Sequence, residues 1–229
     1  MMENAGWALA HQARTMLGGD PRGRRVVVLA GRGGNGGGGL VAARRLSTWG
    51  AEVRTVLAQP PEQMAEVPHH QLAALERLGA PVLGSQDADT VEPALQRAEL
   101  VLDALIGYSL FGAPREPIAA LIRVANIASA PILALDIPSG MNGDTGEAYE
   151  PTIRATTTLT LALPKVGLLW PAAGVWTGDL LLADISVPEV VYRRLGLNVG
   201  PLFARSEIVQ LRITGGASSD EPETVRRAR

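Results

Sequence analysis

The sequence contains no cysteine, which excludes disulfides, thiolate nucleophiles and cysteine-ligated zinc or iron–sulfur sites. Aromatic residues make up 4% of the chain, so Ala, Val and Leu must fill the core. Basic charge is not in excess, with 21 basic against 23 acidic residues, and the balance favours neither a nucleic acid nor an anionic membrane surface as partner. The chain has no apolar run of the ~18 residues that a membrane helix needs, and its polar start lacks the apolar region of a signal peptide. We therefore expect a soluble, cytoplasmic protein.

The 229 residues suit one large domain in which apolar runs alternate with helical patterns. Such alternation predicts an α/β fold, a three-layer α/β/α sandwich around a Rossmann-like, mostly parallel sheet. We expect the domain to span residues 1–213 and the polar residues 214–229 to form a disordered tail. The expected strands are residues 25–31, 52–58, 81–83, 99–105, 131–137, 156–164 and 179–185, the last two without a long helix between them. Four helices are expected. The first has apolar positions at Leu40, Ala43 and Leu46, and the second spans residues 71–78. The third opens with a capping box of Asp89 and Glu92 and ends at Ala98, and the fourth spans residues 118–125.

The most informative segment is the glycine-rich run Gly31–Gly39, which follows the first expected strand and opens a helix. Seven of its nine residues are glycine, which permits positive φ angles and a close approach of the backbone to a ligand. Free N–H groups at the start of the helix attract phosphate or another anion. Gly31, Gly33 and Gly36 satisfy the dinucleotide pattern GxGxxG, but the second strand ends at Gln59 without the acidic residue that the pattern needs. We predict a nucleotide-like ligand here.

Two aspartates, Asp103 and Asp136, end strongly apolar strands. Because ligands of open parallel sheets bind beyond the carboxyl ends of the strands, we expect both to face the glycine-rich run. They are candidates for cation coordination or acid–base catalysis, with a helix cap or turn as the alternative. Asn35, Asp103 and Ser139 offer hard oxygen donors suited to potassium or sodium, whereas no histidine lies at a strand end to favour zinc. Lys165, the only lysine, is expected either to reach a phosphate or to lie in a solvated loop.

With these motifs the sequence resembles the NAD(P)H-hydrate epimerase family, the YjeF N-terminal domain. The family pattern has ENAG, GxGNNGGDGLVAAR, DALFGTG, DIPSG with GDTGE, and APKxGL. This chain has, beside GRGGNGGGGLVAAR, ENAG at Glu3–Gly6, DALIGYS at Asp103–Ser109, DIPSG at Asp136–Gly140, GDTGE at Gly143–Glu147 and LPKVGL at Leu163–Leu168. The matches run in order from Glu3 to about Leu197.

The resemblance implies an enzyme that interconverts the R and S epimers of hydrated NADH or NADPH, with a Rossmann-like fold and a homodimeric state. It implies a potassium ion held by Asn35, Asp103 and Ser139, and Asp136 as the acid/base. The substrate-binding residues expected from the resemblance and from position are Gly34, Asn35, Gly36, Gly37, Gly38, Gly107, Tyr108, Ser109, Leu110, Phe111, Gly112, Ala113, Asp136 and Lys165.

Two glycines depart from the family pattern, since Gly34 and Gly38 stand where it has Asn and Asp. We expect the missing aspartate to lie at the helix N-terminus beside the ligand, where its loss removes a hydrogen-bond acceptor worth about 1–3 kcal/mol of recognition. This departure leaves open an alternative, a non-catalytic nucleotide-binding or scaffolding module on the same fold. An ordinary NAD(P)-dependent oxidoreductase is disfavoured, because no acid follows the second strand and the chain has no Tyr-x-x-x-Lys pair.

Overall fold

The computed structural model describes residues 1–213 and 225–227. The strands are β1 (Arg25–Ala30), β2 (Glu52–Leu57), β3 (Val82–Gly84), β4 (Leu100–Ala104), β5 (Ile132–Leu135), β6 (Thr157–Leu161), β7 (Asp179–Ala183), β8 (Ile208–Ile213) and β9 (Val225–Arg227). The α-helices are α1 (Met2–Met16), α2 (Gly34–Thr48), α3 (Glu66–Arg77), α4 (Ala88–Arg97), α5 (Ile118–Ile127), α6 (Gly174–Thr177) and α7 (Glu189–Arg194).

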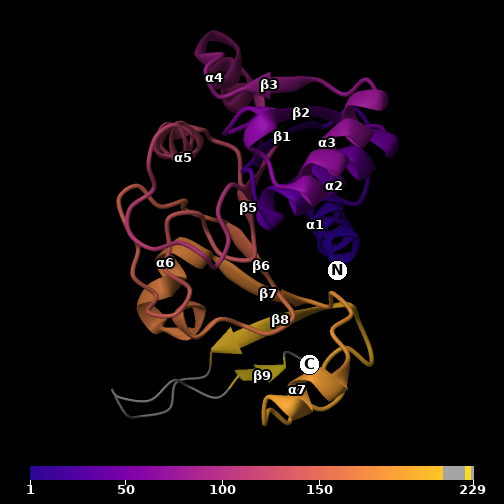
Figure 1. Cartoon of the computed structure of the whole chain (residues 1–229), viewed down its shortest axis with the longest axis vertical. Helices are drawn as coiled ribbons and strands as arrows, with labels where there is room; N and C mark the ends of the chain where they lie inside the picture. The colour runs from indigo at the N-terminus through magenta and orange to yellow at the C-terminus, as the bar shows by residue number, and fades with distance from the viewer. Residues whose placement is uncertain (214–224, 228–229) are drawn as a thin grey trace.

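One sheet with the order β3-β2-β1-β4-β5-β6-β7-β8-β9 organises the molecule (Figure 1). The pairs from β3 to β7 are parallel, and the pairs of β8 with β7 and β9 are antiparallel. The predicted α/β class with a mostly parallel sheet is therefore confirmed.

The three layers follow from the alternation of side chains along the strands. On β1, Val26, Val28 and Ala30 belong to a buried cluster with residues of α1, α2 and α3. Val27 and Leu29, which point to the other face, belong to a second cluster with residues of α4 and α5. Figure 1 accordingly shows α1, α2 and α3 on one side of the sheet and α5 on the other.

The helix starts differ most from the expectation. Helix α1 has buried apolar residues at helical spacing, among them Ala5, Leu9 and Ala13, and no helix was predicted there. Helix α2 begins at Gly34, so six residues of the glycine-rich run are helical. The expected capping box at α4 is wrong, since Asp89 lies inside the helix. Asp87 is the N-cap residue instead, and its Oδ2 accepts the N–H of Gly84 at 2.9 Å.

The C-terminal part of the sheet follows the predicted change of pattern. Between β6 and β7 the chain forms only short helical turns, as expected. Part of the expected disordered tail forms strand β9 instead. This strand pairs with β8, which would otherwise present the unpaired backbone groups of an edge strand. Residues 214–224 and 228–229 of that tail lie outside the described residues. Within the described part of the chain, no helix has the length and apolar character needed to cross a membrane.

Candidate functional site

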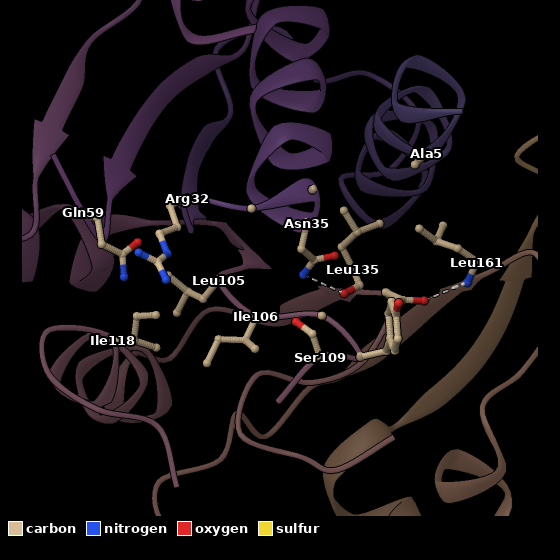
Figure 2. Close-up of a pocket in the computed structure, with 15 residues that line it drawn as sticks. Ala5, Arg32, Asn35, Gln59, Leu105, Ile106, Ser109, Ile118, Leu135 and Leu161 are labelled. Atoms are coloured by element: carbon tan, nitrogen blue, oxygen red, sulfur yellow. Dashed lines mark hydrogen bonds between the residues drawn. The ribbon is translucent and has the colours of Figure 1, made fainter. Parts of the chain in front are cut away.

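A cavity of about 410 Å³ lies at the carboxyl ends of the central strands (Figure 2). The strand order reverses between β1 and β4, because the chain moves from β1 outward to β2 and β3 and then returns to the other side of β1. Ligands of open α/β sheets bind at such a switch point. The turn after β1, the loop after β4 and the first residue after β5 contribute most of the lining, so the topology brings the separate motifs to one place.

The glycine-rich run is a short turn followed by the first turns of α2 rather than a long loop. None of its glycines has a positive φ, so the run does not use the left-handed conformations that glycine permits. The glycines are needed for close packing. A Cβ on Gly36 would lie 1.7 Å from the carbonyl oxygen of Gly31, and one on Gly39 would lie 2.6 Å from the Cβ of Ala104 on β4. Helix α2 therefore starts in contact with the backbone beneath it.

Asn35 is the second residue of α2 and lines the cavity. Its Nδ2 donates a hydrogen bond to the carbonyl oxygen of Leu135 at 3.1 Å, which ties the start of α2 to the end of β5 (Figure 2). No donor to its Oδ1 is found among the described residues. A Cβ placed on Gly107 would be 3.6 Å from this oxygen, so the loop after β4 lies against it.

Asp136 directly follows β5, lines the cavity and is buried, with 6% of its surface exposed. Its φ of +70° lies in the left-handed region, which aspartate adopts more readily than most residues. Its Oδ1 accepts the N–H of Leu161 at 3.3 Å and a hydrogen bond from Nζ of Lys165. Nζ also donates to the carbonyl oxygen of Leu161 at 3.1 Å and to Oγ1 of Thr160 at 3.3 Å. Oδ2 of Asp136 accepts no hydrogen bond from the described part of the chain.

These contacts place Lys165 differently from the solvated loop that was one of its two expected environments. Its side chain is 21% exposed and forms an ion pair with Asp136. Lys165 does not itself line the cavity. A contact between its ammonium group and a phosphate stays a prediction.

Asp103 lies within β4 and is completely buried. Its Oδ1 accepts Oγ–H of Ser139 at 2.6 Å and the N–H of Leu105 at 3.2 Å, and its Oδ2 accepts the N–H of Ser139 at 2.8 Å. Oγ of Ser139 accepts the N–H of Ile106 at 2.9 Å. Burial raises the pKa of Asp103 to about 6, although the hydrogen bonds from Ser139 and Leu105 oppose the rise. The pair fastens the loop after β4 to the DIPSG turn after β5, and neither residue lines the cavity.

The donor set of the expected cation site consists of oxygen atoms alone. Asn35 offers an Oδ1 to which no described residue donates, and the buried carboxylate of Asp103 supplies negative charge. No cluster of three or more His, Asp or Glu suited to a metal occurs in residues 1–213 and 225–227. A hard monovalent cation therefore fits these residues better than zinc or another transition metal does.

The structure brings together six of the expected substrate-binding residues around the cavity: Gly34, Asn35, Gly107, Tyr108, Ser109 and Asp136. Gly36, Gly37 and Gly38 are buried inside α2, and Leu110, Phe111, Gly112 and Ala113 lie further along the loop without lining the cavity. Several lining residues were not predicted, notably Arg32, Gln59, Ile118, Leu135 and Leu161. Two of these carried a signal in the sequence, since Arg32 interrupts the glycine-rich run and Gln59 follows the second expected strand.

The two departures from the family pattern differ in their surroundings. A Cβ on Gly34 would meet no atom of the described residues within 4 Å, so this position is open. A Cβ on Gly38 would lie 2.7 Å from Cδ2 of Leu135. Gly38 is in the second turn of α2, and so the expectation that an aspartate here would lie at the helix N-terminus is wrong.

Comparison with known proteins agrees with the motifs. The family described as YjeF-related protein N-terminus matches residues 1–167. The chain belongs to this family. The YjeF-related relatives include a protein named NAD(P)H-hydrate epimerase from Dehalogenimonas lykanthroporepellens, 47% identical over 92% of this chain and 82% of its own length. Another of the same name, from Truepera radiovictrix, is 38% identical over 86% of this chain and 84% of its own.

A longer YjeF-related protein, named bifunctional NAD(P)H-hydrate repair enzyme Nnr and found in Moorella thermoacetica, is 38% identical over 82% of this chain. The chain spans 36% of that protein's length. The crystal structure of the yeast protein ynu0 superposes with a TM-score of 0.78 at 24% identity, covering 92% of this chain and 89% of the yeast chain. This likeness supports the fold, and the predicted family is confirmed by the sequence relatives.

Proposed function

We propose that the protein is an isomerase that interconverts the R and S epimers of hydrated NADH and NADPH. The observation that carries the proposal is the position of Asp136 in the cavity at the switch point of the sheet. It is a buried carboxylate, and one of its oxygens accepts no hydrogen bond from the described residues. The names of the relatives with 47% and 38% identity supply the substrate class.

The geometry suits acid–base chemistry at a carbon that carries a hydroxyl group next to a ring nitrogen. Hydrogen bonds from Leu161 and Lys165 hold Oδ1 of Asp136, which leaves Oδ2 to exchange a proton with the ligand. When Asp136 carries a proton on Oδ2, it gives that proton to the hydroxyl group, the carbon–oxygen bond breaks, and water leaves while the nitrogen lone pair forms an iminium. Water then adds to the opposite face of the iminium and releases a proton to solvent, and the carboxylate takes up a proton from solvent, which restores the acid. The overall reaction consumes nothing.

We further propose that Asn35, Asp103 and Ser139 hold a potassium ion. Their oxygen donors come from three segments that meet beside the cavity. A bound monovalent cation would supply a fixed positive charge that orients oxygen atoms of the substrate. The homodimer and the cytoplasmic location implied by the resemblance also stay predictions, and light scattering would give the mass of a dimer of 24.1 kDa chains.

The replacement Asp136→Asn tests the catalytic role. Asparagine tolerates the left-handed backbone and still accepts the hydrogen bonds, so the fold should persist while proton exchange is lost. We expect kcat to fall by about 10²- to 10⁴-fold. The measurement is chiral chromatography of the R and S hydrates after mixing pure R hydrate with enzyme in potassium buffer.

The matched control is Asp144→Asn, which removes the same charge from an exposed residue outside the cavity. It should leave kcat unchanged. A wild-type rate equal to that of buffer would contradict the proposal and would favour the alternative of a non-catalytic binding module.

A further inference from the structure

The cavity has two chemically different ends. Figure 2 shows Arg32 and Gln59 together at one end, Leu161 at the other and Asn35 between them. Leu161 bonds to the carboxylate of Asp136, so that end carries the proposed acid/base. The Arg32 end presents a cation.

Arg32 is free to bind an anion. Its side chain is exposed at the cavity, and its guanidinium group makes no hydrogen bond or ion pair with the residues that the structure describes. It lies two residues before α2, whose first turn contains no acidic residue and whose N-cap residue, Gly33, has no side chain to cap the free N–H groups. A planar guanidinium group binds phosphate through two parallel hydrogen bonds.

Gln59 is a second, independent feature of this end. It lies two residues beyond β2, where a dinucleotide-binding sheet has the acidic residue that binds the 2′-hydroxyl of the adenosine ribose. Its Oε1 is buried and has no hydrogen-bond partner among the residues that the structure describes. Figure 2 shows the side chains of Gln59 and Arg32 pointing toward each other. An amide in place of a carboxylate removes the repulsion that a second negative charge on the ribose would meet.

The strand order sets the direction of the ligand. In a sheet with the order β3-β2-β1-β4-β5-β6, the pyrophosphate lies at the helix after β1 and the adenosine ribose at the end of β2. The nicotinamide half then extends past β4 toward β5, which brings the reacting ring to Asp136.

We propose that Arg32 and Gln59 form a binding site for the 2′-phosphate of the adenosine ribose, so that the protein prefers hydrated NADPH to hydrated NADH. The reaction named here rests on the proposed function. The binding site does not depend on turnover. On binding, the guanidinium group of Arg32 pairs with the phosphate, and Gln59 accepts from Arg32 through Oε1 and donates to the phosphate through Nε2.

Binding of adenosine half-ligands tests the site directly. Isothermal titration calorimetry with adenosine 2′,5′-bisphosphate and with AMP measures what the 2′-phosphate contributes to binding affinity, because both ligands carry the 5′-phosphate and only the bisphosphate carries the 2′-phosphate. We expect Arg32→Gln to weaken binding of the bisphosphate by about 10- to 100-fold and binding of AMP by less than about twofold. Arg77→Gln, which removes an exposed arginine outside the cavity, should bind both ligands like the wild type.

Turnover provides a second readout. Arg32→Gln should raise KM for hydrated NADPH with little change in kcat, and should leave both constants for hydrated NADH unchanged. Equal losses for the bisphosphate and AMP would place Arg32 at the 5′-phosphate and overturn the proposal, as would no loss at all. If the losses of binding affinity are as expected but neither the wild type nor any variant epimerises either hydrate, the proposed function fails while the 2′-phosphate site stands.

Discussion

Leu135 lies against two positions of α2, Asn35 and Gly38, which the sequence did not relate to each other. Its carbonyl oxygen accepts the hydrogen bond of Asn35, and its Cδ2 faces the place where a side chain at Gly38 would begin. The glycine at this position and the leucine at the end of β5 therefore depend on each other. A sequence pattern marks the missing aspartate but does not reveal which side chain occupies its space.

We predict that Gly38→Asp and Leu135→Ala interact strongly. Gly38→Asp alone should lower the free energy of unfolding by about 2–4 kcal/mol, because the new carboxylate is buried and crowds Leu135. Leu135→Ala should lower it by about 2–5 kcal/mol through the cavity it leaves. The double variant should lose at least about 1 kcal/mol less than the sum. Urea denaturation of the four proteins measures this, and strict additivity would refute the coupling.

At the scale of elements, the start of α2 differs from the sequence-based prediction. The glycine-rich run looked like a ligand loop because glycine permits unusual backbone angles. The angles are ordinary, and the glycines instead let the helix approach Gly31 and β4. Close approach depends on which segment lies opposite, and that partner is distant in sequence. By contrast, the strands were predictable because their apolar runs are local.

We predict opposite effects for two glycine-to-alanine changes two residues apart in this helix. Gly36→Ala places a methyl group 1.7 Å from a backbone oxygen that cannot move away, so unfolding free energy should fall by at least about 3 kcal/mol. Gly34→Ala meets open space and should raise it by about 0.5–1 kcal/mol, since alanine favours helix. Urea denaturation with circular dichroism compares the two. Equal stabilities would show that the packing of α2 does not require Gly36.

At the scale of the whole molecule, the strand order assembles a site from motifs spread over more than a hundred residues. Asn35, Asp103, Asp136 and Ser139 were predicted as candidates because each lies at or near a strand end, and the sheet brings these ends to one edge. Which of these four residues line the cavity was not predictable from the sequence. Asn35 and Asp136 line the cavity, while Asp103 and Ser139 are hydrogen-bonded to each other outside it. That difference depends on side-chain contacts across the sheet.

The proposed cation would join α2, the end of β4 and the turn after β5, and should therefore stabilise the whole fold. At a potassium concentration ten times Kd the gain is about 1.4 kcal/mol, which corresponds to a rise in Tm of roughly 3–6 °C. Scanning calorimetry in potassium chloride and in choline chloride at equal ionic strength measures it. Asn35→Ala should abolish the difference, and Asn198→Ala, at an exposed position, should keep it. Equal Tm values for the wild type would argue against a cation site.

The single lysine has a practical consequence for handling the protein. Apart from the N-terminus, the ε-amino group of Lys165 is the only amine in the chain, and it contacts Asp136. Any amine-directed label or surface-coupling reaction therefore attaches either at the N-terminal amine or beside the proposed reaction centre. The absence of cysteine offers the safer route, since one cysteine introduced at a remote exposed position would be the sole thiol and would carry a probe without touching the cavity.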